Sequence, residues 1–371
     1  MPVEVGNSAV SVAPQALTSY ALTGERDAVD PEFLEALQIA LGTAGFAPGG
    51  GAEDAALVVN LIDVEEPRPF RRRSRGTFVA GLAGLTADPA DPLRETYPLL
   101  VRSLSNVVLC HVEGRGVWFT TMERGSYFVP GLDPDRLAAD VVARLAPLAR
   151  SRLVIDNEFR PDLEPELWLG DRCTEEIARC GRRLDALGLL PAPFPLEEIL
   201  GERDLRHVKR LYGIGGLSYG NLSMREDAHR FWMSASGVDK SKLREPGRDI
   251  LLVSDYDEHR ARIVLSVPPD ATPRRVSVDA IEHWMIYREN PDVGAIVHIH
   301  AWVDGAASTD VNYPCGTEEL AKSVAALVAA SPNPSRAVVG LRNHGITATG
   351  ETPNEILTRL EPRLRRQVPM S

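Results

Sequence analysis

The sequence predicts an α/β protein with two domains, and three observations support this. The chain has 371 residues, about twice a common domain size, so each half can bury a core of its own. Hydrophobic residues make up 44% and charged residues 25%, as in ordinary globular proteins. Helical and strand-like segments alternate along the first half, which is typical of a layered α/β domain.

The segments of the first half differ in the period of their apolar residues. Strand-like apolar runs occupy 55–64, 76–85, 106–114 and 117–123, whereas helical spacing covers 31–46, 93–104 and 134–149. The proline-rich, acidic stretch 159–171 is the predicted linker, and a further helix is expected over 174–190. We therefore predict an N-terminal α/β domain of unknown role over 1–165 and a second domain over 166–371.

Charge and cysteine content exclude several classes of protein. The net charge of −11 disfavours nucleic acid and anionic membranes as partners. No run approaches the roughly 18 apolar residues of a membrane span, and the first residues do not resemble a signal peptide. The four cysteines are too scattered for a disulfide framework, so we expect a cytoplasmic protein.

Two histidines interrupt an apolar run, GAIVHIHAW, at residues 294–302. In an extended strand, positions i and i+2 face the same side, so His298 and His300 should project together. Two imidazoles on one face can share a metal ion, and a catalytic site commonly adds a third protein ligand and leaves one position open. His344, in LRNHGITATG at the end of another strand-like run, can supply that ligand, and the glycine after it permits a tight turn.

Five ordered blocks resemble the class II aldolase/adducin family. They are GLSYGNLSMR at 216–225, FWMSASGV at 231–238, EHWMIYRENPDVGAIVHIH at 282–300, YPCGTEELAKSVAAL at 313–327 and LRNHGI at 341–346. The resemblance covers about residues 170–371. It implies a central β-sheet flanked by helices and a homotetramer with active sites between subunits. It also implies that His298, His300 and His344 bind a divalent metal, zinc foremost, with iron, manganese and cobalt as alternatives.

The same resemblance assigns roles to the loops around these histidines. Gly220 and Asn221 match the loop that holds a substrate's anionic group and its developing oxyanion, and Ser236 and Gly237 match a second anion loop. Ser277 matches the first of two serines before the catalytic acid. Val278 replaces the second serine and removes a hydroxyl donor, which favours a carboxylate or specialised substrate over a plain sugar phosphate.

The catalytic acid/base of the family lies 19 residues before the first metal histidine. Counting back from His298 reaches Asp279, the shorter acid that epimerases of the family carry here. Its other interpretation is a helix N-cap after Val278. Glu282 is the rival acid if the register slips by one turn.

Two departures from the family pattern affect the site. The stretch between His300 and Tyr313 is some 20 residues shorter than the resemblance implies and lacks the family's proton donor, so Asp304 and Asp310 are candidate replacements. Residues 191–213 form an insertion that can reshape the pocket or an interface.

Together these features favour a metal-dependent lyase of the class II aldolase type. It would perform aldol cleavage, condensation or decarboxylation on a small hydroxy or keto carbonyl compound through a metal-stabilised enediolate, an intermediate that epimerisation shares. The extra first domain favours a biosynthetic step. A non-haem iron oxygenase and an adducin-like binding module stay open as alternatives. The expected partners are a small-molecule substrate and further copies of the chain.

Overall fold

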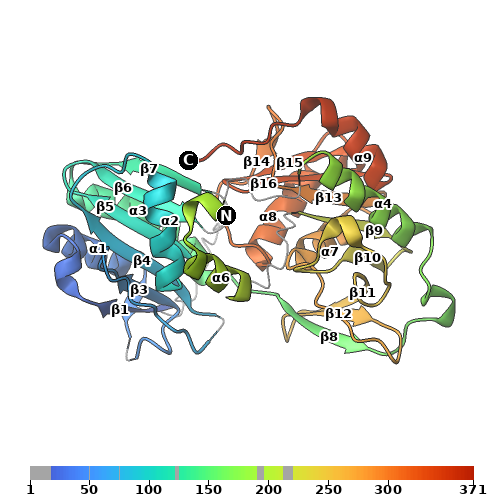
Figure 1. Ribbon diagram of the computed structural model, residues 1–371, viewed down its shortest axis with the longest axis horizontal. Helices are drawn as coiled ribbons and strands as arrows, with labels where there is room; N and C mark the ends of the chain where they lie inside the picture. Colours follow the sequence, from blue (N-terminus) through green and yellow to red (C-terminus); the bar gives the residue numbers. More distant parts are fainter. Residues whose placement is uncertain (1–17, 50, 75, 122–124, 190–195, 212–219) are drawn as a thin grey trace, which may run out of the picture.

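The computed structural model describes residues 18–49, 51–74, 76–121, 125–189, 196–211 and 220–371. They form two units side by side, each built on its own β-sheet with helices against it (Figure 1). The α/β class predicted from the sequence is confirmed. Of the helices in these ranges, none has the length and apolar character needed to cross a membrane.

The first sheet has the strand order β2-β1-β3-β4-β5-β6-β7. The first five strands in that order run parallel, and β6 and β7 add an antiparallel edge. The strands are β1 (Thr18–Gly24), β2 (Phe46–Pro48), β3 (Leu57–Leu61), β4 (Phe78–Leu85), β5 (Val107–Val112), β6 (Gly116–Thr121) and β7 (Gly125–Pro130). The strand-like runs of the first half therefore form one sheet.

Three helices cover the two faces of this sheet. They are α1 (Pro31–Thr43), α2 (Pro92–Ser103) and α3 (Pro134–Arg150), and each begins with proline after an aspartate whose side chain accepts a backbone N–H bond. Aspartate at the N-cap followed by proline is a strong start signal for a helix. The helices α1 and α3 share one core with the sheet, and α2 packs in another on the opposite face.

The second sheet has nine strands in the order β14-β15-β16-β13-β9-β10-β11-β12-β8. The strands are β8 (Asp156–Arg160), β9 (Asn221–Arg225), β10 (Phe231–Ser234), β11 (Ile250–Asp257), β12 (Arg262–Ser266), β13 (Ala295–Ile299), β14 (Ala307–Ser308), β15 (Val338–Leu341) and β16 (Gly345–Gly350). Its helices are α4 (Arg172–Ala186), α7 (Ala280–Glu289), α8 (Glu318–Ala329) and α9 (Pro353–Leu360). β8 lies before the predicted boundary at 165, yet it pairs with β12 in this second sheet.

The predicted insertion lies against the first unit. Its described part contains α5 (Leu196–Ile199) and α6 (Glu202–Leu211), while 190–195 and 212–219 lie outside the described residues. Leu196 and Leu200 are buried beside Tyr97 of α2. Arg102 Nη2 of α2 also pairs with Asp204 Oδ2 at 2.8 Å. The insertion therefore packs on the first unit.

Candidate metal centre

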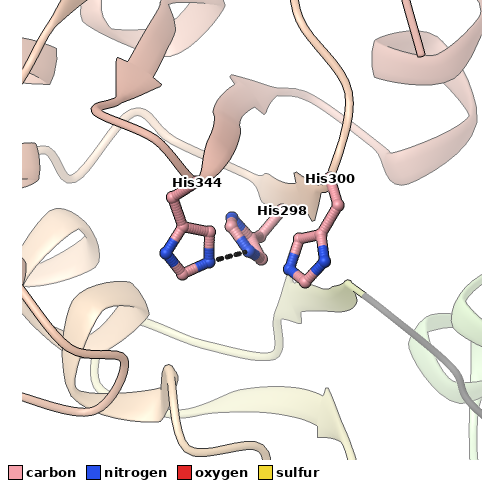
Figure 2. Close-up of side chains that lie close together, drawn as sticks. All are labelled: His298, His300 and His344. Carbon is pink, nitrogen blue, oxygen red and sulfur yellow. Dashed lines mark hydrogen bonds between the residues drawn. The ribbon is translucent and has the colours of Figure 1, made fainter. Parts of the chain in front are cut away.

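The strand β13 places His298 in the middle of the second sheet. All five of its residues are buried, and it lies between β16 and β9. His298 is 1% exposed, whereas His300, just past the strand end, is half-buried. Figure 2 shows both imidazoles projecting from the same end of the strand toward the ring of His344. The alternation of a strand thus brings this pair to one side, as predicted.

The turn between β15 and β16 carries His344. The residue with a left-handed backbone is Asn343, with φ of 56°, and not Gly345, so the expected role of that glycine in a tight turn is wrong. Gly345 instead allows the backbone of the turn to lie close to that of Ile299, because a Cβ at this position would lie 2.3 Å from the Ile299 carbonyl oxygen. This approach lets the turn pack against the end of β13, where His298 and His300 lie.

The three imidazoles surround one point (Figure 2). Their ring centroids are 5.1, 4.8 and 5.1 Å apart, and one nitrogen from each lies within 4.8 Å of the others. The Nε2 atoms of His298 and His344 are 3.1 Å apart. Converging imidazole nitrogens from rings that meet edge to face fit a first-row divalent ion with a position left open.

A buried chain of hydrogen bonds orients His298. Its Nδ1 lies 3.3 Å from Thr347 Oγ1, and that hydroxyl donates to Glu282 Oε1 at 2.5 Å. Thr347 faces His298 directly across the β13–β16 pair. Because Nδ1 is engaged, Nε2 is the nitrogen directed toward the other rings, which is the usual arrangement behind a metal-binding histidine. Thr347 could not be predicted from the sequence, because its place opposite His298 follows only from the strand register.

Glu282 lies on α7 and is 1% exposed. Burial raises its pKa to about 8, and the neighbouring charge of Asp279 acts in the same direction. Its Oε2 has no hydrogen-bond partner among the described residues. The carboxyl group is therefore held neutral at neutral pH behind Thr347, in a place suited to positioning His298.

Asp279 precedes α7 and is bonded to a neighbour of the histidines. Asn221 faces His298 across the β13–β9 pair, and its Nδ2 donates to Asp279 Oδ2 at 2.8 Å. Asp279 occupies the N-cap position of α7, as its other interpretation has it, but its side chain makes no capping bond there. Lys240 lies near it: burial lowers the pKa of Lys240 to about 8, against the opposing charges of Asp279 and Asp239. The sequence analysis missed this buried lysine.

The two predicted anion loops lie at different strand ends. Gly220 has φ of 101°, and a Cβ there would meet the His298 carbonyl oxygen at 2.6 Å. Ser236 and Gly237 follow β10, and the Ser236 N–H donates to the Arg275 carbonyl at 2.8 Å. Ser277 is buried, and its N–H donates to Ser234 at 3.2 Å. Residues 216–219 of the first block lie outside the described residues.

The two candidate replacements for the missing proton donor, Asp304 and Asp310, lie in different surroundings. Asp304 is 58% exposed at its side chain and pairs with Arg365. Asp310 instead lines the same cavity as His344. Cys315, which the sequence analysis did not single out, has its Sγ 3.5 Å from His344 Nε2. Of the two predicted replacements, only Asp310 thus lines the cavity beside His344, and its role as proton donor stays a prediction.

A second group of ligand-type side chains comprises Asp171, Cys173 and Glu226. Asp171 caps α4 by accepting the Thr174 N–H at 2.9 Å. Both carboxylates also accept from the Trp232 indole, at 3.1 and 3.0 Å. Burial and the adjoining Asp171 raise the pKa of Glu226 to about 7. These hydrogen bonds explain why the three side chains lie together: they fix the start of α4.

Part of the second half of the chain is similar in sequence to known proteins. Residues 206–309 match the family model described as the class II aldolase and adducin N-terminal domain. Methylthioribulose-1-phosphate dehydratase of Serratia proteamaculans (strain 568) is 37% identical over 82 residues, which are 22% of this chain and 34% of that protein. The protein of the same name from Xanthomonas campestris pv. campestris (strain B100) is 33% identical over 88 residues, or 24% and 35%. The chain thus spans about a third of the length of these relatives.

Among solved structures, an aldolase II superfamily protein from Pseudomonas syringae is 17% identical, with a TM-score of 0.35, over 54% of this chain and 72% of that chain. The family match includes His298 and His300 and ends before His344. Residues 206–309 of the second unit are thus similar to the class II aldolase and adducin N-terminal domain.

Proposed function

We propose that the protein is a metal-dependent lyase that acts on a small hydroxy or keto carbonyl compound. The observation that carries this proposal is the convergence of the three imidazoles, with one nitrogen of each within 4.8 Å of the others. The family match and the dehydratase relatives, which are similar over about a third of their length, support a lyase. The proposed reaction is aldol cleavage or condensation, or decarboxylation.

His298, His300 and His344 would hold the divalent ion. When bound, such an ion supplies Lewis-acid polarisation of a carbonyl group. Thr347 and Glu282 keep His298 in one ring orientation through their hydrogen bonds. The histidine site therefore needs little reorganisation to receive its ligand.

Asp279 is the proposed acid/base. Asn221 holds one of its oxygens at 2.8 Å, and Asn221 itself faces His298 across the sheet. A carboxylate fixed beside the substrate's carbonyl can take a proton from a neighbouring carbon or hydroxyl group and return it later. Glu282 is assigned to positioning, because its bonded oxygen faces Thr347.

The test is turnover of a panel of hydroxy and keto acids and sugar phosphates, assayed for released aldehyde or carbon dioxide. We expect at least one compound to be converted, with activity lost on chelation and restored by zinc, iron, manganese or cobalt. Asp279→Asn should lower kcat by roughly 10²–10⁴-fold while leaving metal content unchanged.

Each alternative class gives a different result. Conversion that persists after chelation or in His298→Ala contradicts the proposal. Oxygen consumption with iron but not with zinc indicates the oxygenase instead. A metal-loaded protein that converts nothing while binding another protein indicates the adducin-like module.

A further inference from the structure

A cavity of about 510 Å³ lies between the two units and includes His344 in its wall. From the first unit it is lined by Phe119 of β6, Tyr127 of β7 and Leu148 of α3, and from the second by Val278 and Tyr313. A volume of this order suits a small organic ligand. The cavity thus borders the candidate metal centre at His344, and the first unit supplies one of its walls.

The walls of the cavity are largely apolar. The rings of Phe119 and Tyr127 stack with centroids 5.0 Å apart. Val278 stands where the family pattern expects a serine, and it faces this cavity. An apolar side chain at that position favours a hydrocarbon or aromatic group over a phosphate beside the histidines.

Two arginines line the cavity, Arg144 of α3 and Arg342. Arg144 Nη1 donates to the Asp140 carbonyl at 2.9 Å, and Arg342 Nη1 donates to the Asp310 carbonyl at 2.8 Å. Arg342 Nε also donates to the Ser371 carbonyl at 3.3 Å, and within the described ranges neither guanidinium forms an ion pair with a carboxylate side chain. Burial raises the pKa of Tyr127 to about 12, and the charges of Arg144 and Arg342, which line the same cavity, oppose that rise.

We propose that this cavity binds the distal part of the substrate, and that the substrate is an amphipathic organic anion. Its oxygen-bearing reactive end lies at His344, its apolar chain lies against Phe119, Tyr127 and Val278, and its anionic group lies at Arg144 and Arg342. This inference rests on the proposed function for the reactive end alone. It gives the first unit a role, because that unit then selects the substrate.

The test separates the cavity from the metal centre by using metal-free protein and simple probes. The probes are hexanoate, hexyl phosphate and hexan-1-ol, with binding followed by titration calorimetry and ligand-observed NMR. We expect both anions to bind saturably and more tightly than the alcohol. The tighter anion shows whether the site takes a carboxylate or a phosphate.

Two variants on α3 probe the apolar wall. Ala143 is exposed and lines the cavity, so Ala143→Trp should fill part of it and weaken binding of all three probes by about tenfold or more. Ala139 is exposed on the same helix one turn earlier, and it is absent from the described lining. Ala139→Trp is therefore the matched control and should bind like the parent.

Arg144→Gln probes the charge with little change in shape. This variant should weaken the binding of both anions and leave the binding of hexan-1-ol unchanged. Arg136→Gln, at an exposed position of the same helix, should change the binding of none of the three probes. Absence of saturable binding, or equal binding to parent and Ala143→Trp with Arg144→Gln also unchanged, overturns the inference.

His298→Ala distinguishes the two proposals. The variant should lose metal and keep probe binding if the cavity is as described. A parent that binds the probes but no metal contradicts the proposed function and retains the cavity. A parent that binds metal but no probe contradicts the cavity proposal and leaves the proposed function standing.

Discussion

At the scale of single residues, Thr347 is the link between the histidines and the buried acid of α7. Removing its hydroxyl in Thr347→Val should free His298 to rotate, while the three imidazoles remain. We expect metal affinity to fall roughly 10–100-fold, measured by competition with a chelator. Thr349→Val on the same strand is the control: its hydroxyl bonds to Pro334 and Ala337, so stability should fall without this loss. Equal metal affinities for Thr347→Val and the parent would show that the hydrogen bonds from Glu282 through Thr347 to His298 do not contribute to metal binding.

Glu282 makes the stability of the metal-free protein depend on pH. Burial, then the charge of Asp279, raises its pKa from 4.5 to about 8. Between those values the folded chain keeps the proton that the unfolded chain releases, so the free energy of unfolding should fall as pH rises through this window. Urea unfolding of Glu282→Gln across the window should show a flatter profile. Parallel profiles for the two proteins would mean that Glu282 is already ionised when folded.

At the scale of elements, the close approach of β9 to β13 depends on glycine. Gly220 combines a φ of 101° with a Cβ position 2.6 Å from the His298 carbonyl oxygen. Gly220→Ala should therefore destabilise the fold by about 1–3 kcal/mol and also displace His298, lowering metal content. Gly201→Ala, where a Cβ meets nothing within 4 Å, should do neither. Unchanged unfolding and metal content in Gly220→Ala would show that the backbone shifts freely.

Local patterns predicted most of these elements. Period-two and helical spacing identified the strands and helices of the first half, and the pair His298 and His300 faces one side because strand alternation leaves no other choice. The partners of His298 were not predictable, because Asn221 and Thr347 oppose it only through strand register. β8 also escaped prediction: apart from Phe159 its residues DNEFR are polar, and most are exposed, so they carry no alternating apolar pattern.

At the scale of the whole molecule, the insertion from the second half of the chain packs on the first unit through α5. Leu200 is 4% exposed beside α2. Leu200→Ala should cost about 2–5 kcal/mol and should speed amide exchange in β5, which shares that core. Leu132→Ala, at a side chain 81% exposed, is the control with no expected effect. Unaltered exchange in β5 would mean that the insertion contributes little to the first unit.

The cavity is a further property of the whole molecule that the sequence could not reveal. Its lining comes from segments as far apart as Phe78 and Ser371, and the apolar residues look like ordinary core positions in the sequence. The predicted homo-oligomer stays a prediction. The role proposed for the first unit rests on the cavity that it lines together with the second unit.

The measurement that tests the metal centre most directly is elemental analysis of the purified protein, His298→Ala and His207→Ala. His207 is exposed on α6, so its variant controls for adventitious binding by a histidine. We predict close to one divalent ion per chain in the parent and in His207→Ala, and almost none in His298→Ala. A parent without metal that cannot be reloaded, or a His298→Ala variant that retains it, would contradict the assignment of this site.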